Sequence, residues 1–365
     1  MTAGPTRRRL LQGAACGIAL PPAIFGAARP AAAEDALAAL VEGAKGEGAV
    51  LASQNVMQAE SSTKAVAAAF RKKYGLADSF SVEFVIKQSG QMQKQVEDEI
   101  AAGKVSADIL GVNVVAWLSS LAKRGKLMAF EAPEYQAYAA WDDKPGFNNR
   151  PFYVSDPVIL CSIAWNTDLI KGNTFASWFD LLRPEYKGKI TTVSGRLSGS
   201  MAVTYKGMRE TPAIGDRFFE AFAKQEPVTA ILTSNAVTQV ISGEYPITIA
   251  TASRPFAMWR QGAKNIAQSY PKEGVVALAS AFTGLAAAPH PNAAKLMLDF
   301  LRGREAQQIM MDEEGIPSGR ADVTSPNPTF APKLADLKLI YVDQLGITPD
   351  EFRRLGENWR DLFGT

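Results

Sequence analysis

The chain has 365 residues, with 39 Lys and Arg against 37 Asp and Glu, and 47% of its residues are hydrophobic. This near-balance of charge excludes nucleic acid and anionic membrane surfaces as partners, because both demand a clear basic excess. One histidine and two cysteines make a His-based nucleophilic triad or a Cys/His metal cluster hard to assemble. A Ser-Lys or paired-carboxylate site is compatible with these counts, but no such pair falls in the loops that follow the predicted strands, so neither an enzyme nor a metal cofactor is expected. The length exceeds what one hydrophobic core usually supports, which predicts two lobes.

The N-terminus has the parts of an export signal peptide. Three arginines, Arg7 to Arg9, precede an apolar stretch over residues 10–28, and a small-residue cleavage site ends at Ala33. The sequence TRRRLLQG is typical of the twin-arginine route. A membrane anchor is the alternative, but two adjacent prolines and the modest apolar length argue against spanning. We therefore predict a signal peptide over residues 1–33, cleaved near Ala33, and a periplasmic location.

The two cysteines support a soluble mature protein. Gly13 lies three residues before Cys16, where a lipid-attachment box requires an aliphatic side chain, so a lipoprotein is disfavoured. Only Cys161 remains after cleavage, which rules out an intramolecular disulfide, and its apolar neighbours predict a buried side chain. Cleavage removes four arginines and no acidic residue, so the mature net charge is 35 − 37 = −2.

Strands followed by polar loops and helices recur along the mature chain. The expected strands are AVLA (49–52), SVEFVI (81–86) and ADIL (107–110) in the first half, and KITTV (189–193), VTAIL (228–232) and ITIA (247–250) in the second. This alternation of strands and helices predicts an α/β protein. Ligands of open α/β sheets bind beyond the carboxyl ends of the strands, so the six loops that follow these strands form the candidate site.

Two long β-rich segments, residues 153–166 and 275–288, are candidate crossings between the lobes. We expect them to act as hinges, with lobe 1 formed by residues 34–152 and 285–325 and lobe 2 by residues 153–284 and 326–365. Closure about these hinges would bury a ligand and change the outer surface of the protein.

Two further helices are predicted near the C-terminus. Residues 289–315 have the pattern of one long amphipathic helix that stops at Gly315. The last helix begins with a capping box at Thr348, and its single apolar face is expected to dock on the rest of the protein.

Several stretches of the chain resemble a known family. They are FASWFDLLRPEYKGKITTVSGRLSGS (175–200), ISGEYPITIA (241–250) and APHPNAAKLMLDFLRGREAQQ (288–308), with weaker likeness over residues 65–75 and 107–127. In these residues the chain resembles periplasmic substrate-binding proteins of ABC transporters, in the broad class that includes the ferric-iron binders. The resemblance implies a two-lobe periplasmic-binding-protein fold of type II-like topology. It also implies a small-molecule solute and an ABC transporter permease of the inner membrane as partners.

The chain departs from the iron-binding members of that class. Those members hold ferric ion, as the resemblance implies, with an adjacent tyrosine pair, a histidine and a glutamate. Here the tyrosine-pair positions are Ser253 and Arg254, the matching glutamate position is Asn113, and the loop over residues 53–61 contains no histidine. A hard trivalent cation requires anionic oxygen ligands. We therefore do not expect iron to bind, although a ferric-iron transport protein is kept as an alternative.

The candidate ligand-binding residues of the second lobe are Ser198, Gly199, Ser200, Asn235, Ser253 and Arg254. The loop from Ser198 to Ser200 leads into a helix whose N–H groups and dipole favour an anionic oxygen, and a helix cap is its alternative role. Arg254 precedes Pro255, which favours an extended backbone and a guanidinium aimed at a carboxylate or phosphonate. Its alternative is a salt bridge with an acidic neighbour. Asn235 begins its helix and either donates to the ligand or caps the helix.

The candidates of the first lobe are the neutral residues Ser53, Gln54, Asn55, Gln88, Ser89 and Asn113. Such donors and acceptors suit the orientation of a polar organic molecule, and ordinary solvated loop polarity is the alternative for each. The only histidine, His290, is expected to be a turn residue before a helix.

Together these residues predict a monomeric periplasmic solute-binding component of an ABC importer that binds a small organic anion. The six loops carry acidic residues only at their margins, so a polyamine would find little to pair with. The loops contain no aromatic residue on which a sugar could stack. A ligand-binding protein that serves a membrane sensor or chemoreceptor would have the same fold, and the sequence leaves that alternative open.

Overall fold

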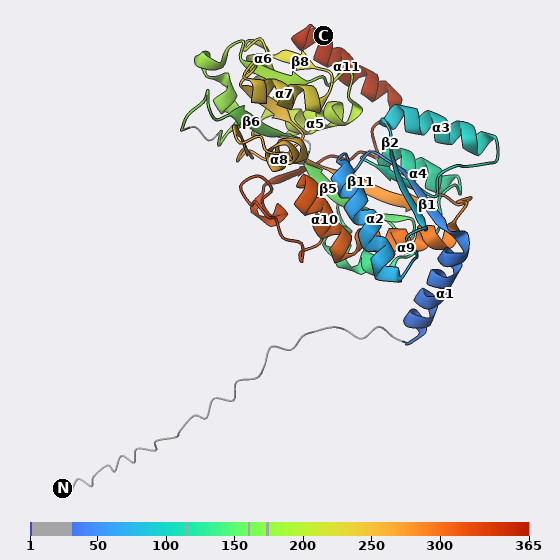
Figure 1. The fold of residues 1–365 in the computed structure, drawn as a ribbon. Helices are drawn as coiled ribbons and strands as arrows, with labels where there is room; N and C mark the ends of the chain where they lie inside the picture. Colours follow the sequence, from blue (N-terminus) through green and yellow to red (C-terminus); the bar gives the residue numbers. More distant parts are fainter. Residues whose placement is uncertain (2–30, 114, 160, 173–174, 365) are drawn as a thin grey trace.

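The computed structural model describes residue 1 and residues 31–364, except residues 114, 160 and 173–174. Most of the predicted signal peptide therefore lies outside the described residues, and the predicted cleavage site at Ala33 falls in the first turn of helix α1 (Ala31–Glu47). The described strands form two sheets with helices packed against them (Figure 1). The predicted α/β architecture with two lobes is observed.

The first lobe is built on a seven-stranded sheet in the order β2-β1-β3-β11-β5-β4, with β12 paired to β11. β1 is parallel to both β2 and β3, so the carboxyl ends of these three strands share one edge of the sheet. Its elements are β1 (Ala49–Gln54), α2 (Glu60–Tyr74), β2 (Ser81–Ile86), α3 (Ser89–Ala101), β3 (Ile109–Val112), α4 (Val115–Lys123), the 3₁₀ helix η1 (Pro133–Trp141), β4 (Asn148–Asn149), β5 (Tyr153–Ile159), β11 (Val275–Gly284) and β12 (Leu339–Tyr341).

The second lobe is built on a five-stranded sheet in the order β10-β6-β9-β7-β8. β7 is parallel to β8 and β9, so these three strands also end at one edge, whereas β6 runs antiparallel to β9 and ends at the opposite edge. Its elements are β6 (Ser162–Asn166), η2 (Trp178–Leu182), η3 (Pro184–Tyr186), β7 (Ile190–Val193), α5 (Gly199–Glu210), α6 (Gly215–Ala223), β8 (Val228–Ala230), α7 (Thr233–Ser242), β9 (Ile247–Ala250), α8 (Ser253–Arg260) and β10 (Ile266–Ser269).

The chain passes from the first sheet to the second between β5 and β6 and returns between β10 and β11. β11 joins the lobes along its length: its first residues, Val275 and Val276, pack in the core of the second lobe, while its later residues pair with β5 and β3. After β12 the chain returns to the second lobe, where α11 (Pro349–Phe363) packs on α5. The predicted cap of this helix is confirmed, because the Thr348 hydroxyl accepts from the Glu351 N–H at 3.2 Å.

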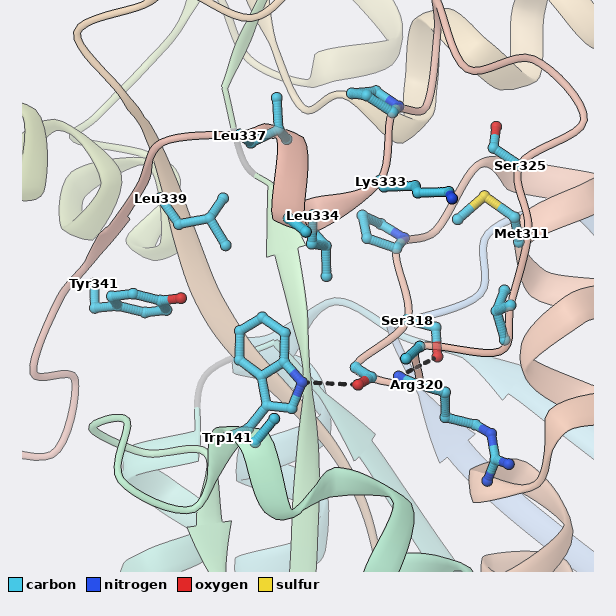
Figure 2. Close-up of a pocket in the computed structure, with 17 residues that line it drawn as sticks. Trp141, Met311, Ser318, Arg320, Ser325, Lys333, Leu334, Leu337, Leu339 and Tyr341 are labelled. Atoms are coloured by element: carbon cyan, nitrogen blue, oxygen red, sulfur yellow. Dashed lines mark hydrogen bonds between the residues drawn. The ribbon is translucent and has the colours of Figure 1, made fainter. Parts of the chain in front are cut away.

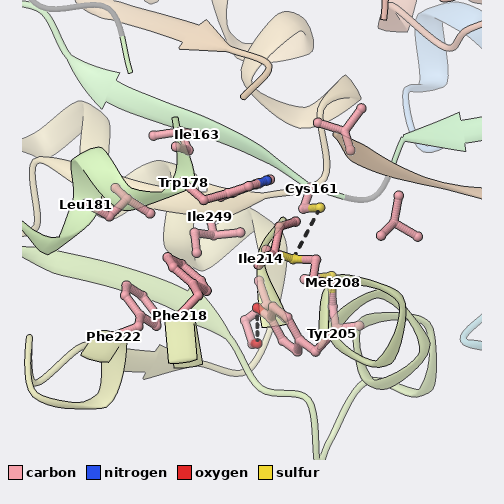
Figure 3. Packing of buried hydrophobic residues seen from close by; sticks show 14 of the residues in the cluster. Cys161, Ile163, Trp178, Leu181, Tyr205, Met208, Ile214, Phe218, Phe222 and Ile249 are labelled. Carbon is pink, nitrogen blue, oxygen red and sulfur yellow. Dashed lines mark hydrogen bonds between the residues drawn. The ribbon is translucent and has the colours of Figure 1, made fainter. Parts of the chain in front are cut away.

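The core of the second lobe is a dense apolar cluster (Figure 3). Cys161 is fully buried in it, as predicted, with its Sγ atom 3.9 Å from the Sδ atom of Met208. Burial raises the pKa of the Cys161 thiol to about 12, which keeps it protonated and inert. Trp359 of α11 stacks on Tyr205 of α5 with ring centroids 4.6 Å apart. The docked C-terminal helix therefore helps to fix α5, whose first turn contains Ser200.

The prediction of a single helix over residues 289–315 is wrong. Two helices are present, α9 (Pro291–Arg302) and α10 (Arg304–Glu314), separated by Gly303 in an extended conformation. Glycine is a poor helix former, and the break lets α10 turn to pack against α2 and α8. The predicted stop at Gly315 is confirmed by its left-handed φ of 65°, and a Cβ there would lie 2.5 Å from the Phe256 ring of α8. The lobes therefore approach closely where α10 meets α8.

Candidate functional site

The predicted residues of the first lobe gather on what we call the first carboxyl edge, the loops and helix starts that follow β1, β2 and β3. The Asn55 side-chain amide donates to Ser89 Oγ at 2.5 Å, and its Oδ1 accepts from the Asn113 backbone N–H at 3.2 Å. Asn113 Oδ1 in turn accepts from Ser280 Oγ of β11 at 3.0 Å. Three loops that are distant in sequence are thus joined by side-chain hydrogen bonds, and Asn55, Ser89 and Asn113 form one polar surface.

The other three first-lobe candidates occupy different settings. Ser53 and Gln54 are buried at the end of β1. Gln54 holds its own loop, because its Oε1 accepts from the Val56 and Met57 N–H groups at 2.7 and 2.8 Å and its Nε2 donates to the Met57 carbonyl at 2.9 Å. Gln88 is exposed before α3 and makes no side-chain cap. Gln54 therefore shapes the loop that presents Asn55.

On the second carboxyl edge, the loops and helix starts that follow β7, β8 and β9, the predicted serine loop has the geometry of a helix cap. Ser198 is the N-cap of α5, and its hydroxyl accepts from the Met201 N–H at 3.4 Å and lies 3.2 Å from Ser200 Oγ. The N–H groups of Gly199 and Ser200 lie in the first turn, where no carbonyl of the helix can accept from them. The first turn of α5 therefore presents N–H groups and hydroxyls at this edge.

Two expectations about the second lobe are wrong. Arg254 is predicted to be extended, but it lies with Ser253 and Pro255 in the first turn of α8. Proline is compatible with the first turn of a helix, where its missing N–H is not needed, and this preference overrides the bias that Pro255 exerts on its predecessor. Asn235 was expected to begin or cap its helix, but it is the third residue of α7 and is exposed. Leu232 occupies the N-cap position instead.

Arg254 reaches the first lobe. Its positive charge acts on Glu314, the last residue of α10, and lowers the pKa of that carboxyl, although burial has the larger effect and leaves the pKa of Glu314 raised. The Glu314 carboxylate accepts from the Gln58 N–H at 2.8 Å and from the Ala59 N–H, so it caps α2 from another helix. Because Gln58 and Ala59 follow β1 and Arg254 follows β9, the two carboxyl edges meet at this point.

Sequence reasoning missed Glu314 and Arg196. Glu314 follows none of the six predicted strands, so only the packing of α10 reveals its place beside the loop after β1. Arg196 is exposed in the loop between β7 and α5, next to the serine loop. Arg196 lies within residues 175–200, one of the stretches that resemble the family, and that resemblance was the signal that could have found it.

The Arg254 side chain has an unsatisfied group. In the described part of the chain, its Nε atom is buried without a hydrogen-bond partner.

A cavity of about 510 Å³ lies elsewhere in the molecule (Figure 2). Its walls come from η1, from the end of α10 and from residues 317–341, and they include Trp141, Leu334, Leu339 and Tyr341. The Trp141 indole donates to the Gly319 carbonyl at 2.8 Å beside this cavity. None of the twelve predicted site residues lines it. The cavity is therefore a feature separate from both carboxyl edges.

Comparison with known proteins identifies the family. The sequence pattern of the bacterial extracellular solute-binding proteins matches residues 65–336. The chain belongs to this family. A curated relative, spermidine/putrescine-binding periplasmic protein 1 of Haemophilus influenzae, is 26% identical over 270 residues, which cover 70% of this chain and 74% of that protein. The predicted resemblance to periplasmic substrate-binding proteins of ABC transporters is thus confirmed at the level of the family.

Solved structures show the same fold. The periplasmic binding protein AfuA of Actinobacillus pleuropneumoniae, with exogenous fructose-6-phosphate bound, superposes with a TM-score of 0.67 at 20% identity, over 86% of this chain and 98% of that one. Iron-bound HitA of Pseudomonas aeruginosa gives 0.65 at 18% identity, over 86% and 99%. The first of these is a periplasmic binding protein, and the predicted two-lobe periplasmic-binding-protein fold is confirmed.

No group of three or more His, Cys, Asp and Glu side chains in the described part is placed to hold a metal ion. No helix among those residues combines the length and apolarity needed to cross a bilayer. His290 lies before α9, as predicted, with its Nδ1 atom 3.0 Å from Asp108 Oδ2.

Proposed function

We propose that this protein is the periplasmic solute-binding component of an ABC importer and that it binds a small organic anion between its carboxyl edges. The observation that carries the anion assignment is the charge of the second edge. The loops and first helical turns after β7, β8 and β9 contain Arg196, Arg254 and the open first turn of α5, and they contain no carboxylate over residues 194–200, 231–235 or 251–254. A helix N-terminus and guanidinium groups both favour negative charge.

Glu314 does not cancel this preference. Its Oε2 oxygen is already engaged by the loop before α2, and the side chain is buried, with Oε1 left without a hydrogen-bond partner in the described part of the chain. Arg254 retains a buried Nε donor without a partner in the described part of the chain, and an unsatisfied buried donor costs roughly 1–3 kcal/mol. A ligand oxygen that lets the guanidinium turn toward the edge offsets this cost. The neutral amides of Asn55 and Asn113 would then orient the rest of the solute.

The cationic groups of the second edge weigh against a polyamine, which is the solute in the name of the Haemophilus influenzae relative. A polyamine needs several accessible carboxylates. In the described part of the chain, the carboxylates near the meeting point of the edges are the buried Glu314 and Glu60, which is exposed at the start of α2 but is paired with Lys64 at 2.6 Å. The polar network of Asn55, Ser89 and Asn113 is also uncharged.

Binding of a solute would close the two lobes. The crossings between β5 and β6 and between β10 and β11, within or next to the predicted hinge segments, are the places about which the lobes would turn. We expect a monomer whose radius of gyration falls on ligand saturation, measured by small-angle scattering of residues 34–365. An unchanged radius at saturation would count against closure.

The anion assignment is tested by a thermal-shift screen of residues 34–365 against carboxylates, phosphonates, sugar phosphates, neutral sugars and polyamines. Hits are followed by calorimetry on wild type, Arg254→Ala and the control Arg260→Ala. Arg260 lies on the same helix but is paired with Glu313 at 2.9 Å. Loss of the clamp should weaken binding by roughly 2–5 kcal/mol in Arg254→Ala only. Stabilisation by spermidine or putrescine alone would refute the anion assignment.

A further inference from the structure

The second carboxyl edge is apolar as well as cationic. Besides Met1, six large hydrophobic side chains of the described residues are exposed by 44% or more of their surface, and four of them lie on the carboxyl edges. Leu197, Ile231 and Leu232 belong to the second edge and are exposed by 63%, 66% and 45%, and Ile86 at the end of β2 is exposed by 44%. Scattered single hydrophobic residues are ordinary, but a cluster at a candidate binding site requires an explanation.

These apolar side chains are neighbours of the anion-binding groups. Leu197 stands between Arg196 and Ser198 in the chain. The loops after β7 and β8 start side by side, since the Ser194 N–H donates to the Ala230 carbonyl at 3.1 Å, and Ile231 follows Ala230 directly. The loop after β8 also approaches the loop that leads to Arg254, with the Thr233 and Thr251 hydroxyls 3.5 Å apart. One edge therefore combines positive charge with aliphatic surface.

The fold itself gives no reason for this exposure. Leu197, Ile231 and Leu232 are not among the described residues that form the apolar core of the second lobe. Among the described residues, the opposite edge of the same sheet carries one comparable side chain, Leu169, exposed by 58%, in the turn after β6. Exposed apolar area next to cationic groups is the arrangement that binds an amphipathic anion, because its charge and its chain are recognised together.

We propose that the solute is a monocarboxylate with an aliphatic chain of several carbons. Its carboxylate is held by Arg254 and the first turn of α5, and its chain covers Leu197, Ile231 and Leu232, with Ile86 approaching from the first lobe. This inference rests on the proposed function and makes it narrower: it excludes compact, fully polar anions such as dicarboxylates and sugar phosphates as the preferred solutes.

The test is calorimetry of residues 34–365 with acetate, butyrate, hexanoate and octanoate, beside succinate, adipate and suberate. Each added methylene that the edge buries should tighten monocarboxylate binding about fourfold, equivalent to about 0.8 kcal/mol. Leu197→Ser and Ile231→Ser should flatten this dependence on chain length and weaken octanoate binding roughly tenfold each. Leu169→Ser, an equally exposed leucine at the opposite edge, should bind like wild type.

Different results of these binding measurements would contradict different parts of the two proposals. Binding of dicarboxylates or phosphate esters without any dependence on chain length would overturn the inference and leave the proposed anion transport intact. A chain-length dependence that survives in Leu197→Ser and Ile231→Ser would overturn the assignment of these side chains. If those variants lose closure with a compact polar anion, the apolar residues serve contact between the lobes and the inference is wrong. Binding of spermidine but of no anion would overturn both proposals.

Discussion

The two carboxyl edges use their polar residues in opposite ways. On the first edge, Asn55, Ser89 and Asn113 bond to one another, and Gln54 bonds within its own loop. On the second edge, Arg196 is exposed, and the first turn of α5 keeps open N–H groups. The polar side chains of the first edge are therefore held in place by bonds to one another before any ligand binds, whereas the second edge offers groups that a ligand can engage. Pre-organisation lowers the entropy cost of binding on one side, and the open donors determine which ligand binds.

Asp156 and Arg302 form a buried ion pair in the first lobe. Asp156 also accepts from Gln307 Nε2 at 3.0 Å and from the Gly319 N–H at 2.9 Å. Asp156→Ala would leave the Arg302 guanidinium buried and unpaired, so we expect the free energy of unfolding to fall by roughly 3–5 kcal/mol. Chemical denaturation measures this change.

An exposed pair of the second lobe is the control for that substitution. Asp168 lies 3.6 Å from Lys171 with 70% of its side chain exposed. Asp168→Ala should change the unfolding free energy by less than about 1 kcal/mol, because water screens exposed pairs. Similar losses in the two variants would contradict the contrast between buried and exposed pairs.

A smaller effect is expected from the amide network of the first edge. Asn55→Ala removes the donor to Ser89 and the acceptor for the Asn113 N–H, so the unfolding free energy should fall by roughly 1–3 kcal/mol. Asn235→Ala on the second edge removes an exposed side chain and should stay within about 0.5 kcal/mol of wild type. Equal stability of the two variants would show that the first edge is no more rigidly bonded than the second.

The contact between the edges predicts a pH dependence. Burial raises the pKa of Glu314 above its ordinary value of 4.5, so the folded chain binds this proton more tightly than the unfolded chain. The stability contribution of Glu314 is therefore greatest at low pH and declines as the pH rises from 4.5 through the raised pKa. The slope cannot exceed about 1.4 kcal/mol per pH unit for one proton.

Glu314→Gln removes this titration while keeping an acceptor for the loop before α2. As the pH rises through the same window, the free energy of unfolding of wild type should fall relative to that of Glu314→Gln. Urea denaturation of both proteins at several pH values measures this difference. Arg254→Met removes a charge that lowers the pKa of Glu314, so the window should extend to higher pH. Glu313→Gln, which changes the half-buried neighbour paired with Arg260, is the control. Parallel pH profiles for wild type and Glu314→Gln would rule out this coupling.

Much of the fold could be predicted because the hydrophobic periodicity of strands and helices, and the glycines at which helices end, are local features of the sequence. Strands such as residues 81–86 and 247–250 match their predictions residue for residue, and Gly315 ends its helix as expected. The break at Gly303 was missed, since a glycine within an amphipathic pattern is compatible with both a continuous and a broken helix. Only the packing of α10 against α2 and α8 decides between them.

The candidate site was less predictable because its contacts are not local. The sequence indicated that Asn55, Ser89 and Asn113 follow parallel strands, and the structure joins them by hydrogen bonds. It could not indicate that Glu314, more than 250 residues from Gln58, would bond to the same loop. The conformation of Arg254 was mispredicted because the restriction before proline was weighed without the helix that follows.

The smallest stability effect separates the two roles of Ser198. As an N-cap its hydroxyl accepts from the Met201 N–H, so Ser198→Ala should lower the unfolding free energy by about 1 kcal/mol, whereas glycine is nearly as good a cap and should cost only about a few tenths of a kcal/mol. Ser198→Gly thus removes the hydroxyl while leaving the helix start nearly intact. If the hydroxyl contacts the solute, Ser198→Gly should bind an anion found in the screen several-fold more weakly with almost unchanged stability, since one neutral hydrogen bond contributes about 0.5–1.5 kcal/mol. If Ser198 is only a cap, Ser198→Gly should bind like wild type, and the open N–H groups of α5 and the Ser200 hydroxyl would then be the groups of this loop left to engage the ligand.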